Sequence, residues 1–449
     1  MLFLQQKKHI LFGAILLLVA AYINGFPIVY SDTSTYLASG FELETPIDRP
    51  IAYGLFLRAS SLNGVSLWLT IGVQALIISF LLWTSIQLLL KNKPRSSKIQ
   101  FFFFSLLVLI SSTSLSWVTS ELIADIMTPI LILSVLLLLL GKPSTLEKMA
   151  LYSLFFLATS CHLSHVTFNL ILLTLIGLFY ALNMLGAKAH MTLKPFFLLL
   201  ALTFGSFLTM GSAFSKSKHV FFMGALVEHG IAKTYLDEYC PEHDYKLCAY
   251  KEQLPSKGYD FLWNPQSPFY KIGGWENTKE EFDSIIFTTL TTPKYIFIHI
   301  QASLKATLEQ LLQFGIGDGN GVFLKQTLLY QRVGTYFGLS QQAQYAKSLQ
   351  NKNKLSLLNS YNDFLQCIIG LSFLAALFIL FNYKKYKPTI LIFFVLLMLA
   401  LILNAWSCGT FANALDRLGA KVIWLLPFGV LLVAFSRQKT TADPSCDTI

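Results

Sequence analysis

Six acidic residues of this chain lie just beyond long apolar segments, where carboxylates are costly. Four follow the first apolar segment and two occupy a short connection between later ones: Asp32, Glu42, Glu44 and Asp48, then Glu121 and Asp125. Carboxylates held at the edge of a bilayer are typical of functional sites. The chemistry that suits them is general-base catalysis, in which a carboxylate takes the proton of an acceptor hydroxyl group.

Asp32 lies in the segment PIVYSDTSTYL, residues 27–37, about six residues beyond the first apolar segment. Partial burial there is expected to raise its pKa and improve it as a base. The alternative is structural, because Asp or Ser ahead of Thr33 is a good N-cap for a short helix over residues 33–39. We predict Asp32 and Asp48 as the catalytic acids.

Glu121 and Asp125 lie in SWVTSELIADIMTP, residues 116–129. If this segment opens a helix, the two acids are separated by one turn and share a face. The loop contains no basic residue, so their charges need a cation from elsewhere. We predict a second acidic site here, and the alternative is helix capping by Glu121.

Three arginines are candidates for binding a phosphate group, because a guanidinium matches phosphate oxygens in a bidentate manner. They are Arg49, Arg58 and Arg417. For Arg417, an anchor at the membrane interface or a neighbour of Asp416 is the alternative. A base combined with such cations suits a reaction with a phosphate leaving group, and a divalent cation as cofactor stays open.

Histidine and cysteine pairs complete the candidate residues. His162 and His165 are three residues apart and could bind a metal or a phosphate, or simply be a hydrogen-bonded pair. Cys240 and Cys248 are close in sequence within a polar segment, which predicts a disulfide. A zinc site that adds His243 and Asp244 is the rival interpretation.

The composition indicates a polytopic membrane protein. Hydrophobic residues make up 54% of the chain and charged residues 13%, and the mean hydropathy is +0.57. Such long apolar segments exclude a soluble fold. The net charge of +10 does not indicate nucleic-acid binding, because the basic residues lie in the gaps between apolar segments.

We predict an all-α membrane protein with about ten transmembrane helices. The expected spans cover residues 9–26, 66–90, 100–116, 122–141, 149–162, 166–185, 195–213, 364–382, 388–405 and 421–436. Lysine and arginine gather in the loops on one side, which predicts that both termini are cytoplasmic. The expected location is a bacterial inner (plasma) membrane.

Three regions are expected along the chain. Residues 1–213 form an N-terminal transmembrane block, whose external loop 27–65 contains an interfacial helix over residues 51–62. Residues 214–363 form an external, mainly helical segment, with one helix starting near Thr278 and another run over residues 294–314. Residues 364–449 form the last transmembrane helices and a cytoplasmic tail.

The order of these features resembles the GT-C superfamily of polytopic glycosyltransferases, which use polyprenyl-phosphate-linked sugars. The similarity lies in YSDTSTYL and DRPIAYGLFLR of the first external loop and in TSELIADIMTP of the second, and it covers residues 1–185. It implies that Asp32 is the catalytic base and that Glu121 or Asp125 is the second acid. The adjacent acidic pair usual in the first loop is absent, because Thr33 follows Asp32.

The implied function is transfer of a sugar from a lipid-phosphate donor to a glycan, lipid or protein acceptor on the external face. The alternatives are a transporter or flippase of a lipid-linked intermediate and a non-catalytic factor in envelope assembly. Membrane lipid and the donor are the expected partners, nucleic acid is not, and the sequence does not identify whether a protein partner exists.

Overall fold

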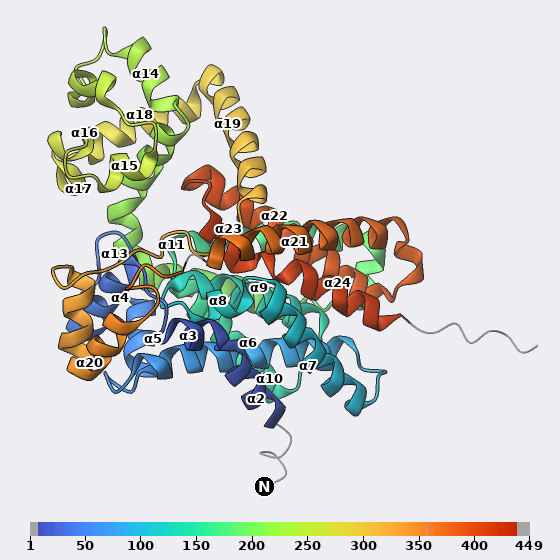
Figure 1. The fold of residues 1–449 in the computed structure, drawn as a ribbon. Helices are drawn as coiled ribbons and strands as arrows, with labels where there is room; N and C mark the ends of the chain where they lie inside the picture. The colour runs from blue at the N-terminus through green and yellow to red at the C-terminus, as the bar shows by residue number, and fades with distance from the viewer. Residues whose placement is uncertain (1–7, 356, 438–449) are drawn as a thin grey trace, which may run out of the picture.

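The structure is a computed structural model that describes residues 8–355 and 357–437. Its regular secondary structure is helical over these ranges, as predicted, apart from one isolated parallel bridge between Ile28 and Glu121. The cytoplasmic tail expected after residue 437 and the first seven residues lie outside the described residues. Figure 1 shows a large helical block with a smaller body attached to it.

The described helices fall short of ten spans. Five are long and apolar enough to cross a membrane, namely Leu67–Leu89, Leu163–Ala181, Leu358–Phe381, Pro388–Phe411 and Asp416–Ser436. A sixth is added if Met184–His190 and Lys194–Thr209, which meet at a bend of 96°, count as one broken span. A membrane-embedded helical fold is therefore supported, and a count of ten is not.

The first expected span, residues 9–26, is broken. Helix α2 (Lys8–Leu17) ends at Leu17, and α3 (Val19–Asn24) begins after Leu18, whose backbone angles (φ −88°, ψ 9°) are not helical. The external loop then forms α4 (Ser31–Glu42) and α5 (Ala52–Ser60), which agrees with the two short helices expected there. These two pack closely because Gly40 and Gly54 face each other, and a Cβ on Gly40 would lie 2.2 Å from the carbonyl oxygen of Gly54.

The rest of the large block consists of longer helices around one apolar core. Its helices before the smaller body are α6 (Leu67–Leu89), α7 (Arg95–Ser112), α8 (Leu115–Ser120), α9 (Met127–Leu140), α10 (Thr145–Ser160), α11 (Leu163–Ala181) and α12 (Ala187–His190). Helix α9 is buried along its whole length at the centre of the core. The block is completed by α20 (Leu328–Lys347), α21 (Leu357–Phe381), α22 (Pro388–Phe411), α23 (Asp416–Ile423) and α24 (Leu425–Ser436).

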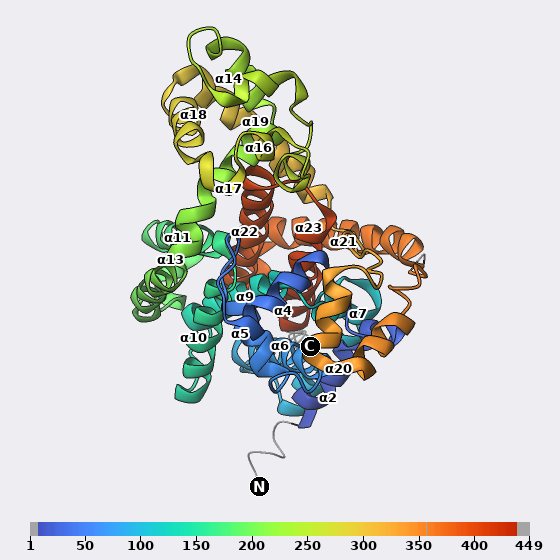
Figure 2. The same cartoon turned by 90° about the vertical axis from the view of Figure 1, so that its left-hand side faces the viewer.

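The smaller body has its own apolar core, formed within residues 220–302. Helix α13 (Lys194–Glu228) leads into it and α19 (Pro293–Leu312) leads out, and both views show these two helices joining it to the block (Figures 1 and 2). Between them lie α14 (Ile231–Tyr239), α15 (Gly258–Trp263), α16 (Pro268–Lys271), α17 (Gly274–Asn277) and α18 (Lys279–Thr291). Helix α18 begins after Thr278, as expected, although no side-chain capping bond forms there.

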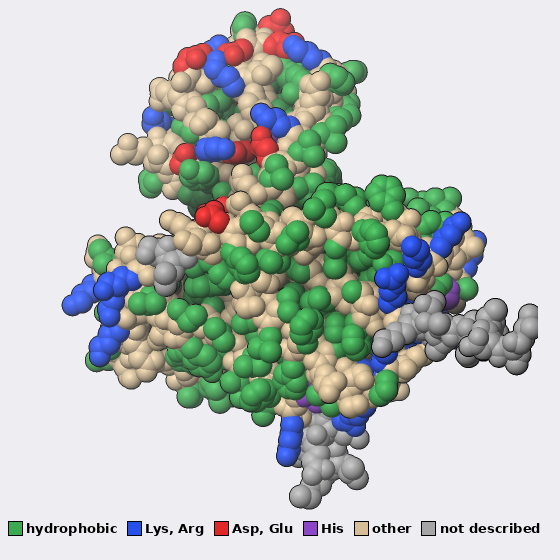
Figure 3. Space-filling model, turned by 45° about the vertical axis from the view of Figure 1, so that its right-hand side comes forward, with side chains coloured by type: hydrophobic (Ala, Val, Ile, Leu, Met, Phe, Trp, Pro, Cys, Tyr) green, Lys and Arg blue, Asp and Glu red, His purple; other side chains and the backbone are tan. Residues whose placement is uncertain are grey.

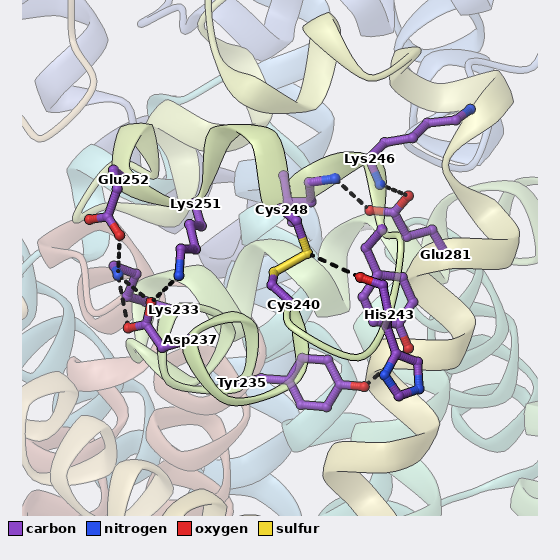
Figure 4. Close-up of a disulfide and its surroundings, with 12 residues drawn as sticks. Lys233, Tyr235, Asp237, Cys240, His243, Lys246, Cys248, Lys251, Glu252 and Glu281 are labelled. Carbon is purple, nitrogen blue, oxygen red and sulfur yellow. Dashed lines mark hydrogen bonds and ion pairs between the residues drawn. A yellow bond between two sulfur atoms is a disulfide. The ribbon is translucent and has the colours of Figure 1, made fainter.

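The predicted disulfide between Cys240 and Cys248 is present in the smaller body, where it closes the loop after α14 (Figure 4). The same loop is tied to α18, because the carboxylate of Glu281 accepts hydrogen bonds from the backbone N–H groups of Lys246 and Leu247, at 3.0 and 2.9 Å. The sulfur atoms are thus bonded to each other and form no zinc site.

After α19 the chain returns to the large block, whose core includes Phe314 and Ile316. Helix α20 packs on α4, and its buried residues Leu329, Val333 and Phe337 belong to the core of the large block. The segment predicted as one external region, residues 214–363, therefore contains both the smaller body and a part of the block that covers loop 27–65.

Candidate functional site

Six charged side chains from distant parts of the chain meet in the large block. We call this group the charged cluster, and its members are Asp32, Asp48, Arg49, Asp125, Arg417 and Lys421. Asp32 lies in the first turn of α4, Asp48 and Arg49 precede α5, and Asp125 lies in the 3₁₀ helix Ala124–Ile126. Arg417 and Lys421 are one turn apart on α23, so they share a face.

Asp32 lies between two arginines, one on each carboxylate oxygen. Arg49 Nη1 is 3.3 Å from Oδ1, and Arg417 Nη1 is 3.4 Å from Oδ2. The side chain of Asp32 keeps 29% of its surface exposed, whereas those of Arg49 and Arg417 keep 15% and 23%. All three side chains therefore keep part of their surface open to solvent.

The pKa of Asp32 is held below its ordinary value. Burial alone would raise it, but the positive charges of Arg49 and then Arg417 outweigh burial. The prediction of a raised pKa is therefore wrong, because the two arginines lie close to Asp32 in the fold and residue spacing did not reveal this. Asp32 is ionised at neutral pH and able to accept a proton.

Arg49 is held in place by Asp48. Its Nε and Nη2 atoms donate hydrogen bonds of 2.9 and 2.6 Å to Asp48 Oδ2. Asp48 thus lies in the cluster, as expected from the sequence, but it contacts the arginine and not the other acids. Its geometry suits orientation of Arg49 better than proton transfer.

Asp125 forms the buried end of the cluster. Its Oδ1 is 3.4 Å from Lys421 Nζ, and its Oδ2 is 3.5 Å from Arg417 Nε. The side chains of Asp125 and Lys421 are only 4% and 3% exposed. Removing one partner of such a buried pair leaves an uncompensated charge, which typically costs about 3–5 kcal/mol.

Glu121 and Asp125 do not share a helix face, which corrects the prediction. Helix α8 ends at Ser120, and Glu121 is extended at φ −86° and ψ 139°. The helix breaks because this segment pairs with loop 27–65. The N–H of Ile28 donates to the carbonyl of Ser120, and the N–H of Leu122 donates to the carbonyl of Ile28. Gln74 fixes the same turn by donating to the carbonyls of Thr119 and Glu121.

Glu121 instead accepts a hydrogen bond of 2.8 Å from the hydroxyl of Tyr30. Burial raises its pKa to about 7, against the opposing effect of the Tyr30 hydrogen bond. The carboxyl is therefore close to half protonated at neutral pH. No ion pair joins Glu121 to the charged cluster among the described residues.

Two tyrosines lie beneath the arginines. Arg49 lies over the ring of Tyr36 at 5.1 Å from its centroid, and Arg417 lies over Tyr30 at 5.5 Å. Such contacts keep guanidinium groups in position without neutralising them. Both tyrosines flank Asp32 in PIVYSDTSTYL, yet a tyrosine near an acid carries no specific signal in a single sequence.

Helix α23 is anchored at its N-terminus. Asp416 Oδ1 accepts from the N–H of Gly315 at 2.9 Å, and the carbonyl of Leu415 accepts from Gln310 Nε2 at 2.9 Å. The N–H of Arg417 donates to Asp318 at 3.3 Å. The carboxylate of Asp416 therefore bonds to Gly315, whereas the guanidinium of Arg417 pairs with Asp32 and Asp125. Lys421 and Asp318 were not predicted as site residues. The contact of Lys421 with Asp125 and that of Asp318 with Arg417 form only when the chain folds.

Arg58 lies apart from the cluster. Its Nε donates to Asn63 Oδ1 at 2.7 Å, its Nη1 donates to the carbonyl of Gly40 at 3.3 Å, and its guanidinium lies over Phe41. Of the three arginines expected to bind phosphate, only Arg49 and Arg417 share a partner.

His162 and His165 lie close together but are already hydrogen-bonded. The rings are 5.2 Å apart; His165 contacts Thr128 Oγ1 and the carbonyl of Ala158, and His162 Nδ1 contacts Ser164. Burial, followed by the charge of Lys421, lowers the pKa of His162 to about 4, so its ring is neutral.

The carboxylates of the cluster do not fit a metal ion well, because arginine or lysine already faces each of them. The described residues contain no group of three or more His, Cys, Asp or Glu placed to hold a metal.

Comparisons of the chain with models of protein families, with curated proteins and with solved structures find no match.

Proposed function

We propose that the protein is an integral-membrane glycosyltransferase that moves a sugar from a lipid-phosphate donor to an acceptor hydroxyl group. The single observation that carries the proposal is the position of Asp32, a partly exposed carboxylate with one arginine on each oxygen. It combines a base with two phosphate-binding cations, which is what this reaction needs.

In the proposed step, Asp32 takes the proton of the acceptor hydroxyl as its oxygen bonds to the anomeric carbon of the sugar. The bond from that carbon to the phosphate oxygen breaks, and the phosphate leaves with the electron pair. Arg49 and Arg417 stabilise the negative charge that develops there. Attack opposite the leaving group inverts the anomeric centre.

Binding of the donor also favours the base. In the structure both arginines face Asp32 and lower its pKa. A phosphate that engages these guanidinium groups draws part of their charge away from Asp32, so its pKa rises towards the value of a useful base. Asp48 and Asp125 hold the two arginines while this exchange occurs.

Arg49 and Arg417 can be tested with a binding measurement on purified protein. The probe is a short polyprenyl phosphate, and the matching polyprenol without phosphate reports the contribution of the hydrocarbon chain. We expect Arg49→Gln and Arg417→Gln each to weaken binding of the phosphate by about tenfold or more, since a charge-assisted hydrogen bond contributes on the order of 1.5–3 kcal/mol.

Arg58→Gln is the matched control, because Arg58 is on the same loop but contacts Asn63 and Gly40. It should leave binding unchanged, and none of the variants should alter binding of the polyprenol. Equal affinity of the wild type and both cluster variants for the phosphate would refute a donor site at these arginines.

A transporter or flippase of a lipid-linked intermediate is the second candidate. The buried pair of Asp125 and Lys421 favours it, since ionisable residues inside a membrane bundle often mark transport pathways. A transporter moves its substrate without making a new glycosidic bond, so mass spectrometry of the products separates the two functions.

A further inference from the structure

An apolar groove of about 410 Å³ lies where the smaller body meets the large block. Its wall combines residues of α13, α18, α19 and α22, among them Phe222, Ile300, Leu304, Trp406 and Phe411. The volume is in the range of small-molecule sites, which are usually apolar with few polar groups. The groove is separate from the charged cluster, none of whose residues lines it.

The polar groups of the wall are mostly bonded to one another. Trp406 Nε1 donates to Ser303 Oγ at 2.9 Å, and Ser303 Oγ bonds to Thr410 Oγ1 at 2.8 Å. His229 Nε2 contacts the carbonyl of Thr410 at 3.1 Å. The buried Nε2 atom of His299 is the exception, with no partner in the described residues. A ligand of this groove therefore gains little from hydrogen bonds and much from apolar contact.

The groove continues into an exposed apolar stripe along α19. The stripe consists of Phe297, Ile300, Leu304, Leu308 and Leu311, which are 61%, 53%, 62%, 65% and 36% exposed. Their spacing of three or four residues places them on one face of the helix. A contiguous exposed face of this kind is unusual in water and marks contact with a protein or a membrane.

The position of α19 favours the membrane as the partner. Its other face packs directly on α22, where a Cβ added to Gly409 would lie 2.5 Å from the carbonyl oxygen of Ala306. Helix α22 is one of the candidate membrane spans, and Gly409 is near its end. The stripe thus runs beside one end of a candidate span.

One flank of the smaller body is apolar. Figure 3 shows hydrophobic side chains over the large block and along one flank of the smaller body, whereas acidic and basic side chains lie at its far end and also across the part nearer the block. At the junction itself, Glu228 pairs with Lys257 and accepts a hydrogen bond from Asn413. The apolar flank is therefore the part of the smaller body that suits contact with a bilayer.

We propose that the groove between α13, α19 and α22 binds the hydrocarbon chain of a membrane lipid, and that the stripe on α19 lies in the adjoining leaflet. The smaller body then contacts the membrane surface by way of α19. This inference requires insertion into a membrane, but it does not depend on the transfer reaction.

The groove is tested with the full-length protein in vesicles of phosphatidylcholine that carry a diazirine near the end of one acyl chain. After illumination, we expect lipid adducts on peptides from α19 and from the last turns of α22. Ile300→Asp places a charge at an exposed position of the wall, so the yield of these adducts should fall by about fivefold or more.

Leu328→Asp on α20 is the matched control, because Leu328 is 61% exposed and lies outside the groove. It should leave the adducts on α19 and α22 unchanged. Absence of adducts from both helices in the wild type, with labelling of other spans, would overturn the proposal.

The stripe is tested independently by spin labelling, in protein whose cysteines other than Cys240 and Cys248 are changed to serine. A nitroxide at Leu304→Cys should be more accessible to oxygen than to a water-soluble nickel complex, and one at Lys305→Cys should show the reverse. Lys305 is the neighbouring residue and its side chain is 79% exposed. Access of the nickel complex to both sites, or of neither reagent to Leu304→Cys, would contradict contact with lipid.

Discussion

At the scale of residues, the three carboxylates of the charged cluster and the carboxyl of Glu121 have different surroundings. Asp32 remains partly exposed, Asp48 holds Arg49, and Asp125 lies buried against Lys421. Glu121 bonds to Tyr30 instead of to a cation. Similar side chains thus differ in exposure, and Asp32, at 29%, is more exposed than Asp48 at 10% or Asp125 at 4%.

Glu121 should make stability depend on pH. Burial raises its pKa from 4.5 to about 7, so the folded state holds the proton more tightly than the unfolded state does. Stability from this group is present below pH 4.5 and is lost as the pH rises towards 7. The free energy of unfolding should therefore differ between these two pH values by about 3 kcal/mol at most from this group.

Thermal unfolding of the purified protein across this pH range measures the effect. Glu121→Gln keeps the shape and the acceptor oxygen but cannot ionise, so its unfolding temperature should fall less between pH 4.5 and 7 than that of the wild type. Parallel pH profiles for the two proteins would show that Glu121 does not titrate in this range.

The sequence predicted most members of the cluster but not their contacts. Asp32, Asp48, Arg49, Asp125 and Arg417 carried charge beside apolar segments, and that costly placement was visible without a structure. Their pairing was not visible, because Asp32 and Arg417 are 385 residues apart. Lys421 was missed because a lysine at the edge of a span is ordinarily a topology signal.

At the scale of elements, local sequence and tertiary pairing compete in the segment after α8. The sequence favoured a continuous helix through Glu121 and Asp125. Backbone bonds with Ile28 break that helix and direct the two side chains to different partners. By contrast, α4 and α5 matched the prediction, since each is a short helix whose pattern is local in sequence, although Tyr30 and not Ser31 or Asp32 is the N-cap of α4.

The disulfide belongs to the same scale, because it joins two elements of the smaller body. Replacing Cys240 and Cys248 together by serine frees a short loop, which should cost about 2–3 kcal/mol in the chain-entropy model. Hydrogen exchange of amides in α14 and the following 3₁₀ helix (Lys246–Gln253) should therefore become faster.

Exchange in the large block provides the internal control. The smaller body has a separate core, so amides of α6 and α9 should keep their wild-type rates. Equal acceleration in both parts would mean that they unfold together, and no change in α14 would mean that the bridge adds little stability.

At the scale of the whole molecule, the charged cluster and the lipid groove lie on either side of the connection between α22 and α23. Thr410 and Phe411 end α22 beside the groove, and Arg417 follows six residues after Phe411 at the cluster. Composition was sufficient to predict a helical membrane protein. The division into two bodies and the broken first span depended on contacts between distant helices, which composition does not encode.

The central claim is that Asp32 is the base of a sugar transfer. The most direct measurement compares lipid-linked sugars and glycans, by mass spectrometry, in cells that lack the protein and are complemented with the wild type, Asp32→Asn or Glu44→Gln. Glu44 is an exposed acid of the same loop and controls for loss of charge. Expression and membrane insertion of each variant are measured in parallel.

We predict that Asp32→Asn lowers the wild-type product by about a hundredfold or more while its sugar donor accumulates, because a general base typically contributes 10²–10⁴-fold to a rate. Glu44→Gln should restore the product in full. Wild-type product levels from inserted Asp32→Asn would contradict the account.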